Sequence, residues 1–256
     1  MNKPIIFVTN DDGIYAPGIH NLVACLPDEA LIYVVAPEAQ HSGQSSAITV
    51  KDPLRITPHE EYTNDRVKVF SVNGTPVDCV KIAMHALLPG KPAMAVSGIN
   101  HGSNAGCSVI YSGTMGATFE ACMLGIPAVG FSLLDHSLKA DFTACMPYIR
   151  DINSAVLEKG LPDGVCLNIN FPKSQRLDGI KVVGAARSHW TDEYEEYVDP
   201  SGKKFYMLTG TLINEEPDNH GTDLYWLDRN YGTIVPVTPE QTQFDAIPII
   251  KGIVKA

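Results

Sequence analysis

The chain has 256 residues, of which 45% are hydrophobic and 19% are charged, a composition typical of a globular protein with a sizeable core. Its formal net charge of −10 argues against a broad nucleic-acid-binding surface, so we expect no stable nucleic-acid partner. The sequence begins without a signal-peptide pattern, and no apolar run approaches the roughly 18 residues that span a bilayer, which predicts a cytoplasmic protein without a membrane partner.

Six cysteines are scattered through the chain, and no two of them form a CxxC pair. Most lie in apolar segments such as "LVACL" and "TFEACML". We therefore expect reduced, mostly buried thiols, and neither a disulfide framework nor a zinc–thiolate site.

The first part of the chain predicts a β-α-β unit. Residues 4–9 form a short apolar run, residues 17–26 have helical spacing with a proline at the first position, and residues 30–37 form a second apolar run. Continuous apolar strands joined by a helix indicate a parallel sheet that is covered on both faces.

Two adjacent carboxylates, Asp11 and Asp12, lie in the "NDDG" stretch between the first strand and the helix. A plain Asp-Gly turn or a helix N-cap would account for them structurally. Neighbouring carboxylates repel each other unless a cation lies between them, so the pair also predicts a site for a hard divalent cation.

A polar loop over residues 38–47 follows the second strand, and "ITVKDPLRITP" and "RVKVFSVNG" then predict two extended segments that could form a hairpin. Residues 74–90 predict a helix, because Thr75 and Asp78 have the spacing of a capping box and a proline lies between them.

The stretch "PAMAVSGIN" predicts a strand that ends at Ser97, and a long loop leads from it to a helix over residues 114–125. The strand "IPAVGFSLL" follows. Residues 138–160 then predict a helix that Pro147 breaks or kinks, and "GVCLNINFP" predicts one more strand.

Beyond about residue 180, strand-like segments surround an Asp-Pro-Ser-Gly turn, which predicts a long hairpin or arm, and a short helix and a strand come after it. No internal repeat, low-complexity tract or linker divides the chain. We therefore predict one α/β domain over residues 1–256, with a doubly wound core at about 1–185 and an arm and C-terminal extension at about 186–256.

Polar side chains follow three of the predicted strands, and in an open parallel sheet the carboxyl ends of the strands meet at one rim where ligands bind. These residues are Asn10, Asp11 and Asp12; His41, Ser42, Gly43, Ser45 and Ser46; and Asn100, His101, Asn104, Ser112 and Thr114. Each loop alone has a plain structural explanation. Their coincidence at one rim predicts an oxygen-ligand site for Mg²⁺, Mn²⁺ or Ca²⁺.

The stretch "YSGTMGA", residues 111–117, places small residues directly before a helix. An ordinary N-cap would explain it, but free N–H groups at a helix N-terminus also bind anions, and Ser112 and Thr114 add hydroxyl donors. A phosphate site next to a metal site predicts a phosphate ester as the substrate.

Five stretches in order, "TNDDGIYAPGI", "HSGQSSAIT", "NGTPVDCV", "VSGINHGSN" and "IYSGTMGATFEACMLGIPAVGFSL", together resemble the SurE family of metal-dependent nucleoside monophosphate phosphatases. Weaker similarity continues through the arm, so the resemblance covers nearly the whole chain. It implies a Rossmann-like, three-layer α/β/α core with a protruding C-terminal β-hairpin arm, and dimers or tetramers formed through that arm.

The resemblance also implies the site residues. The metal ligands would be Asp11, Asp12, Ser42 and Asn100, and the phosphate-binding residues would be Asn104, Ser112, Gly113 and Thr114. The chain departs from many relatives in having Ser108 in place of an acidic residue, "AQH" before the ligand serine and "DPSG" at the arm turn. These departures leave the four ligands intact and concern substrate preference.

The expected reaction is hydrolysis of a nucleoside 5′- or 3′-monophosphate, with one divalent cation per subunit, Mg²⁺ or Mn²⁺, activating a water molecule. Asp11 and Asp12 are the expected catalytic residues, and Asp11 would orient the water. A covalent aspartyl-phosphate is the less favoured route, because a metal-bound carboxylate is a poor nucleophile and the "DxDG" spacing is absent.

Two other functions remain open on the residues alone: a metal-dependent deacetylase or glycosyl-transfer enzyme, and a nucleotide-binding protein without catalysis. The absence of GxGxxG after the first strand argues against NAD or FAD. For the arm, Tyr194, Tyr197, Phe205 and Tyr206 supply apolar area for a homodimer or homotetramer, and the alternative is an arm that folds back on its own core.

Overall fold

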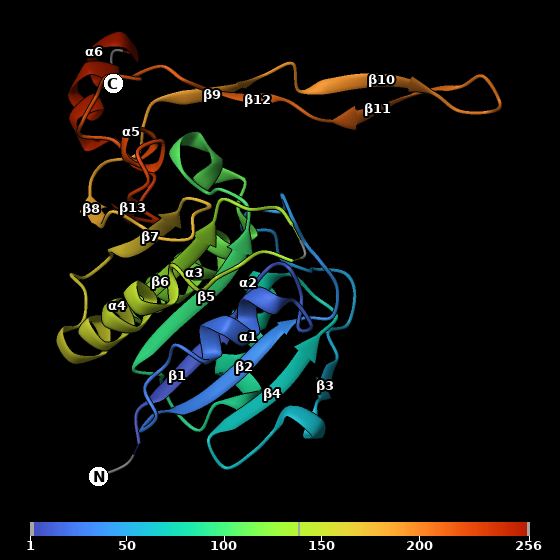
Figure 1. Cartoon of the computed structure of the whole chain (residues 1–256), viewed down its shortest axis with the longest axis vertical. Coiled ribbons are helices and arrows are strands. Elements are labelled where there is room, and N and C mark those ends of the chain that lie inside the picture. The colour runs from blue at the N-terminus through green and yellow to red at the C-terminus, as the bar shows by residue number, and fades with distance from the viewer. Residues whose placement is uncertain (1–2, 138, 255–256) are drawn as a thin grey trace.

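The computed structural model describes residues 3–137 and 139–254, and its centre is a nine-stranded sheet of order β3-β4-β2-β1-β5-β6-β7-β13-β8 (Figure 1). The strands are β1 Ile5–Thr9, β2 Leu31–Pro37, β3 Ile56–Pro58, β4 Val67–Val72, β5 Met94–His101, β6 Ala128–Leu133, β7 Cys166–Phe171, β8 Ile180–Val182 and β13 Gly232–Val237. The six strands from β4 to β7 pair in parallel, whereas β3 runs antiparallel to β4 and β13 antiparallel to β7. The predicted mostly parallel sheet is confirmed.

Helices cover both faces of this sheet. They are α1 Pro17–Val23, α2 Pro76–Ile82, α3 Gly113–Met123 and α4 Met146–Lys159, and the C-terminal extension adds α5 Asp223–Leu227 and α6 Ile247–Val254. Leu22 of α1 and Ile149 of α4 belong to one buried cluster, and Val80 of α2 and Ala121 of α3 belong to a second cluster. Two separate cores on the two faces make the three-layer α/β/α arrangement that the resemblance implies.

The capping box predicted for the second helix is present. The Thr75 side chain accepts a hydrogen bond from the Asp78 N–H at 3.1 Å, and the Asp78 carboxylate accepts one from the Thr75 N–H at 2.9 Å. Pro76 occupies the first turn, where a missing N–H leaves no helical hydrogen bond unmade. Local sequence therefore fixes where α2 begins.

The prediction for residues 138–160 was wrong about Pro147. Helix α4 begins at Met146, so this proline lies in the first turn and neither breaks nor kinks the helix. Residue 138 lies outside the described part of the chain.

Strand β5 continues past Ser97, where the sequence predicted its end, to His101. Its pairing with β6 is irregular between Ser97 and Asn100. Asn100 and His101 are therefore carried by the end of a central strand and not by a free loop, which fixes their positions at the rim of the sheet.

The strand order reverses between β1 and β5, the two central strands. From β1 the chain moves outward to β2 and β4, and β5 starts the other half of the sheet on the opposite side of β1. Such a switch point leaves a crevice outside the carboxyl ends of the two strands, where open α/β sheets bind ligands.

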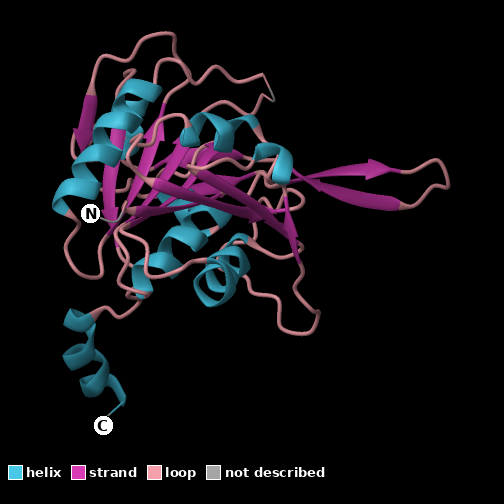
Figure 2. Cartoon of the chain, turned by 90° about the horizontal axis from the view of Figure 1, so that it is seen from below, coloured by secondary structure: helices cyan, strands magenta, loops and turns pink. Residues whose placement is uncertain are grey.

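The predicted hairpin arm is confirmed and extends far from the core (Figures 1 and 2). Its root is the antiparallel pair β9 Ser188–Thr191 and β12 Thr211–Asn214, and its outer part is the pair β10 Tyr194–Val198 and β11 Lys204–Leu208. After the arm the chain returns to the main sheet, where β13 lies between β7 and β8.

Two further features complete the fold. Helix α6, which the sequence analysis did not predict, lies apart from the layered body in Figure 2 and exposes Ile249 and Ile253. Five of the six cysteines are buried and Cys107 is half-buried, as expected. Within residues 3–137 and 139–254, no helix combines the length and the apolar character that crossing a bilayer requires.

Candidate metal and phosphate site

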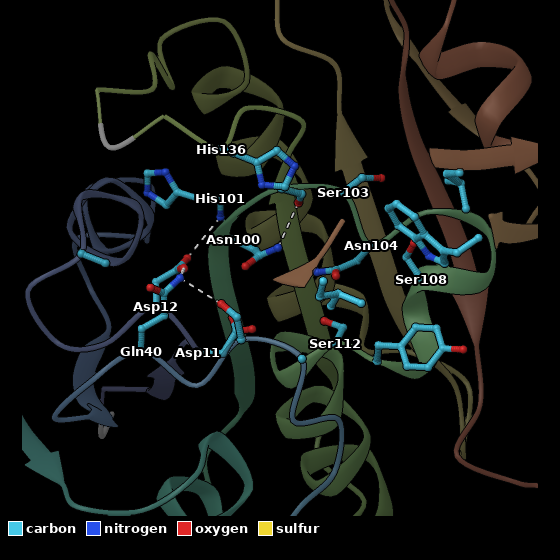
Figure 3. Close-up of a pocket in the computed structure, with 18 of the residues that line it drawn as sticks. Asp11, Asp12, Gln40, Asn100, His101, Ser103, Asn104, Ser108, Ser112 and His136 are labelled. Atoms are coloured by element: carbon cyan, nitrogen blue, oxygen red, sulfur yellow. Dashed lines mark hydrogen bonds between the residues drawn. The ribbon is translucent and has the colours of Figure 1, made fainter. Parts of the chain in front are cut away.

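A cavity of about 890 Å³ opens at the switch point, where the carboxyl ends of β1 and β5 meet (Figure 3). Eight of the residues predicted at the rim line it: Asp11, Asp12, Ser42, Gly43, Asn100, His101, Asn104 and Ser112. These side chains come from three segments that are far apart in the sequence: the loop after β1, the loop after β2, and the end of β5 with the residues that follow it. The structure therefore brings these residues together, whereas six others that were predicted do not line the cavity: Asn10, His41, Ser45, Ser46, Gly113 and Thr114.

Asp11 is buried beside the N-terminus of α3. Its Oδ1 accepts a hydrogen bond from the Thr114 hydroxyl. Burial, followed by the neighbouring charge of Asp12, raises the pKa of Asp11 from its ordinary value of 3.8 to about 6, although hydrogen bonds from Thr114 act in the opposite direction. An ionised Asp11 is therefore poorly stabilised by the protein alone, and a cation would favour it.

Asp12 connects the other two loops of the rim. Its Oδ2 accepts a hydrogen bond from the His101 N–H at 3.1 Å, and its Oδ1 lies 3.4 Å from Gln40 Nε2, which also donates to Ser42 Oγ at 2.9 Å. Burial raises the pKa of Asp12 as well. Gln40, which the sequence analysis did not single out, thus joins the loop of Ser42 to the carboxylate pair.

Asn100 presents an oxygen to the same cavity. Its Nδ2 donates to the Gly102 carbonyl oxygen at 2.9 Å, so Oδ1 is the amide atom left for a ligand. An amide oxygen held in one orientation suits a hard cation, which prefers oxygen ligands.

The loop before α3 and the first turn of that helix pack directly against Asp11. Ser112 lines the cavity and caps the helix, because its Oγ accepts from the Met115 N–H at 3.0 Å. A Cβ at Gly113 would lie 2.8 Å from the Asp11 Cβ, so only glycine allows the helix to approach so closely. Thr114 is fully buried with its hydroxyl on Asp11, and its side chain therefore acts on the cavity through that carboxylate.

Asn104 is held by a network of buried amides and a hydroxyl. Its backbone N–H donates to Asn170 Oδ1, its carbonyl accepts from Asn168 Nδ2, and its own Nδ2 donates to Ser132 Oγ, each at 2.8 Å. Fully satisfied buried networks of this kind keep a side chain in one orientation. Asn104 therefore enters the cavity as a pre-positioned group.

Two histidines near the site differ in their access to the cavity. The Nδ1 of His101 lies 3.0 Å from the Ser137 carbonyl oxygen, and the ring packs edge-on against Phe142. His136 is exposed at the cavity rim, packed against Gly102, where a Cβ would lie 2.5 Å from its ring. The sequence analysis missed His136, although it follows the end of β6 and the strand-end rule could have found it.

The root of the arm closes one side of the cavity. Trp190 and Leu212 come from the root strands β9 and β12, and Tyr194 and Leu208 from the start of the outer pair. This wall is largely apolar, in contrast to the polar rim around Asp11 and Asp12. Only the folded arrangement reveals it, because nothing in the local sequence connects these residues to residue 11.

The donor set at the rim fits a hard divalent cation. It combines the buried carboxylate of Asp11 and the half-buried carboxylate of Asp12 with one hydroxyl and one amide oxygen, which are the ligand types that Mg²⁺ and Mn²⁺ accept. Across the described parts of the chain, no group of three or more His, Cys, Asp or Glu side chains could hold a metal ion, so a thiolate- or histidine-rich centre is not available there. The raised pKa of Asp11 agrees with this, because burial and the neighbouring charge of Asp12 disfavour its ionised form, which a cation would favour.

The sheet order and the cavity at the switch point place the protein in the class of doubly wound α/β proteins that bind a ligand at the carboxyl ends of their strands. The family model described as survival protein SurE matches residues 6–192. Among solved structures, the crystal structure of SurE protein from Aquifex aeolicus superposes with a TM-score of 0.83 at 30% identity, over 98% of this chain and 100% of that chain.

Two curated relatives named 5′-nucleotidase SurE are similar over nearly their full lengths. The protein from Flavobacterium psychrophilum is 46% identical over 254 residues, which is 98% of each chain. The protein from Bacteroides fragilis is 41% identical over 250 residues, 98% of this chain and 97% of that one. The chain belongs to the SurE family.

Proposed function

We propose that this chain is a phosphatase that hydrolyses nucleoside 5′- and 3′-monophosphates to nucleoside and phosphate in a reaction that depends on a divalent metal ion. The observation that carries the proposal is a pair of adjacent carboxylates in a cavity large enough for a mononucleotide: Asp11, which is buried beside the N-terminus of α3, and Asp12, which is half-buried. The relatives named 5′-nucleotidase SurE support the same activity.

Asp11, Asp12, Ser42 and Asn100 would hold one Mg²⁺ or Mn²⁺ ion per subunit. When bound, the ion would supply Lewis acidity, which polarises the phosphoryl group and favours deprotonation of the attacking water. Asp11 is the residue that we assign to orienting this water, because Thr114 and Gly113 fix the carboxylate from the side of α3.

The phosphate itself would lie between Asn104 and the first turn of α3. The Ser112 hydroxyl and the backbone N–H of Gly113 are the donors that this helix end offers, since the Thr114 hydroxyl is directed at Asp11. Donors held before the reaction stabilise charge that develops on the phosphoryl oxygens. The nucleoside would then lie against the apolar wall that Trp190 and Leu212 form at the root of the arm.

The test is phosphate release from a panel of 5′- and 3′-nucleoside monophosphates. The protein is treated with EDTA and dialysed, and Mg²⁺ or Mn²⁺ is then restored. We expect release to disappear with EDTA and to return with metal, and the panel ranks base and phosphate position. Binding of a mononucleotide without release under either metal would contradict the proposal and favour a nucleotide-binding protein.

We also propose that the chain forms a homodimer or homotetramer through the arm and acts in the cytoplasm. The outer arm exposes Tyr194, Phe205 and Tyr206, which an isolated hairpin would leave in water. The buried cysteines suit a reducing compartment.

A further inference from the structure

The segment between β5 and α3 is held in its middle by the C-terminal part of the chain. This segment contains the short 3₁₀ helix η3 Gly106–Ile110. The Gly106 N–H donates to Asp223 Oδ2 and the Cys107 N–H donates to Ser188 Oγ, each at 2.9 Å. These bonds connect η3 to the first residue of α5 and to the first residue of the arm root.

Asp223 is a fully buried carboxylate that binds backbone groups of three segments. Besides Gly106, its Oδ1 accepts from the N–H groups of Ala186 and Leu224, both at 2.8 Å. Burial raises the pKa of Asp223, and these N–H donors act in the opposite direction. None of the ion pairs between described residues includes Asp223. Its charge is therefore balanced by fixed backbone dipoles, which hold the three segments in register.

The packing around Gly106 leaves no room for the segment to shift toward the extension. Gly106 has φ +55°, and a Cβ on it would lie 2.5 Å from Ser188 Oγ and 3.3 Å from Leu224 Cδ1. Beside it, Ala105 and Leu224 belong to a small buried apolar cluster that joins this segment to the extension. Hydrogen bonds and packing thus fix the same point of the backbone.

That point lies between two parts of the cavity wall. On one side Asn104 is attached to β6 and β7 through Ser132 and Asn170, and on the other side the Tyr111 carbonyl accepts from the Ser45 N–H at 3.0 Å. Between these attachments, Asp223 and Ser188 supply the side-chain hydrogen bonds that reach η3 from the C-terminal extension. Without them, the backbone that leads to Ser112 and Gly113 would lose its anchor on this side.

We infer that Asp223 is a positioning residue for the phosphate subsite: it acts through the Gly106 N–H, supported by Ser188, and holds the loop that presents Ser112 and the first turn of α3. The inference rests on the proposed phosphatase function of that site. It makes the C-terminal extension part of the catalytic apparatus, although the extension supplies neither metal ligands nor phosphate donors. A displacement of about 1 Å at such a loop can cost on the order of 100-fold in rate.

The test compares Asp223→Asn with the unchanged protein. An asparagine keeps the shape of the side chain but offers one acceptor oxygen, so a donor N–H₂ must face either Gly106 or the pair Ala186 and Leu224. We expect kcat/KM for the best nucleoside monophosphate to fall about 10- to 100-fold, and the inhibition constant of inorganic phosphate to rise in parallel. Hydrogen exchange should become faster at the amides of Gly106 and Cys107.

Two further variants separate positioning from general destabilisation. Val235→Ala removes buried volume from β13, elsewhere in the extension, and at a temperature where all the proteins are folded it should retain kcat/KM while its melting temperature falls. Ser188→Ala removes the acceptor of the Cys107 N–H, together with a long hydrogen bond of 3.5 Å from Ser188 Oγ to the Ala186 carbonyl oxygen, and it should lower kcat/KM at least threefold. If Asp223→Asn does not fold, Ser188→Ala tests the positioning role in its place, and an unchanged kcat/KM in Ser188→Ala would then overturn the inference.

Unchanged kcat/KM and unchanged exchange at Gly106 in the Asp223→Asn protein would overturn the inference, as would a loss in Val235→Ala equal to that in Asp223→Asn. If the unchanged protein releases no phosphate from any nucleoside monophosphate, the proposed function fails. The positioning role is then decided by hydrogen exchange and by the affinity for inorganic phosphate, neither of which requires turnover.

Discussion

Two features of the Asp11 side chain disfavour its ionised form: its burial and the neighbouring carboxylate of Asp12. Natural proteins keep such costs where function needs them. Asp11→Asn removes the charge and keeps the shape. We expect the variant to unfold at an equal or higher urea concentration than the unchanged protein in EDTA, because the repulsion is relieved. Phosphate release should fall at least 100-fold, measured with saturating Mn²⁺ and Mg²⁺.

Asp28→Asn is the matched control for this variant, since the Asp28 side chain is fully exposed and the chemical change is the same. Asp28→Asn should change neither the urea concentration at which the protein unfolds nor the rate of phosphate release. Full activity of Asp11→Asn under both metals would remove Asp11 from the ligand set.

At the scale of an element, the start of α2 gives a pH-dependent contribution to stability. Burial raises the pKa of Asp78, but hydrogen bonds from Thr49 and Thr75 outweigh it and hold the pKa below the ordinary value of 3.8. A carboxyl whose folded-state pKa is depressed stabilises the fold above its unfolded pKa, near 3.9, and loses that contribution as the pH falls through the folded pKa.

We therefore expect the free energy of unfolding to decrease below about pH 4 more steeply in the unchanged protein than in Asp78→Asn, whose amide does not titrate. Above pH 5 the variant should be less stable by about 1 kcal/mol or more, because the charged cap is lost. Urea unfolding between pH 3 and pH 7 measures both effects. Parallel pH curves for the two proteins would contradict the assignment.

The arm is the second element with a testable consequence. Thr191 and Thr211 are paired at the outer end of the root, so residues 192–210 can be replaced by an Asn-Gly turn. The replacement keeps Trp190 and Leu212 in the cavity wall and removes Tyr194 and Leu208 from it. If the arm joins subunits, light scattering should show the mass of the variant falling to that of one chain, 27.7 kDa.

A double substitution, Tyr197→Ser with Phe205→Ser, tests the arm without shortening it, because these two half-exposed rings stack at 5.6 Å on its outer part. It should shift the mass in the same direction. A shortened chain that keeps the mass of the unchanged assembly would place the interface elsewhere.

Over the whole molecule, the features predicted from sequence are those that local signals or strand order determine. The capping box of α2, the β-α-β start and the gathering of Asp11, Ser42 and Asn100 at one rim follow from turn chemistry and from the geometry of parallel sheets. The limits of β5 were missed because its irregular pairing depends on β6 and not on its own residues.

Contacts between distant segments could not be predicted in this way. Asp223 lies 117 positions from Gly106, and no local pattern connects the first residue of α5 to a loop so far away. The same holds for the arm residues that wall the cavity and for the Thr114 hydroxyl, whose direction toward Asp11 depends on how α3 docks. The roles of the metal ligands and phosphate donors stay predictions, and Asp11→Asn tests the role of Asp11.

The position of β13 has a consequence for synthesis on the ribosome. This strand lies between β7 and β8 although it follows β8 by some fifty residues, so one edge of β7 stays unpaired until the chain has been made through Val237. An unpaired strand edge readily pairs with another chain. The nascent protein therefore passes through a stage with an open sheet edge and without the Asp223 anchor, and both are completed only when residues 223–237 have emerged.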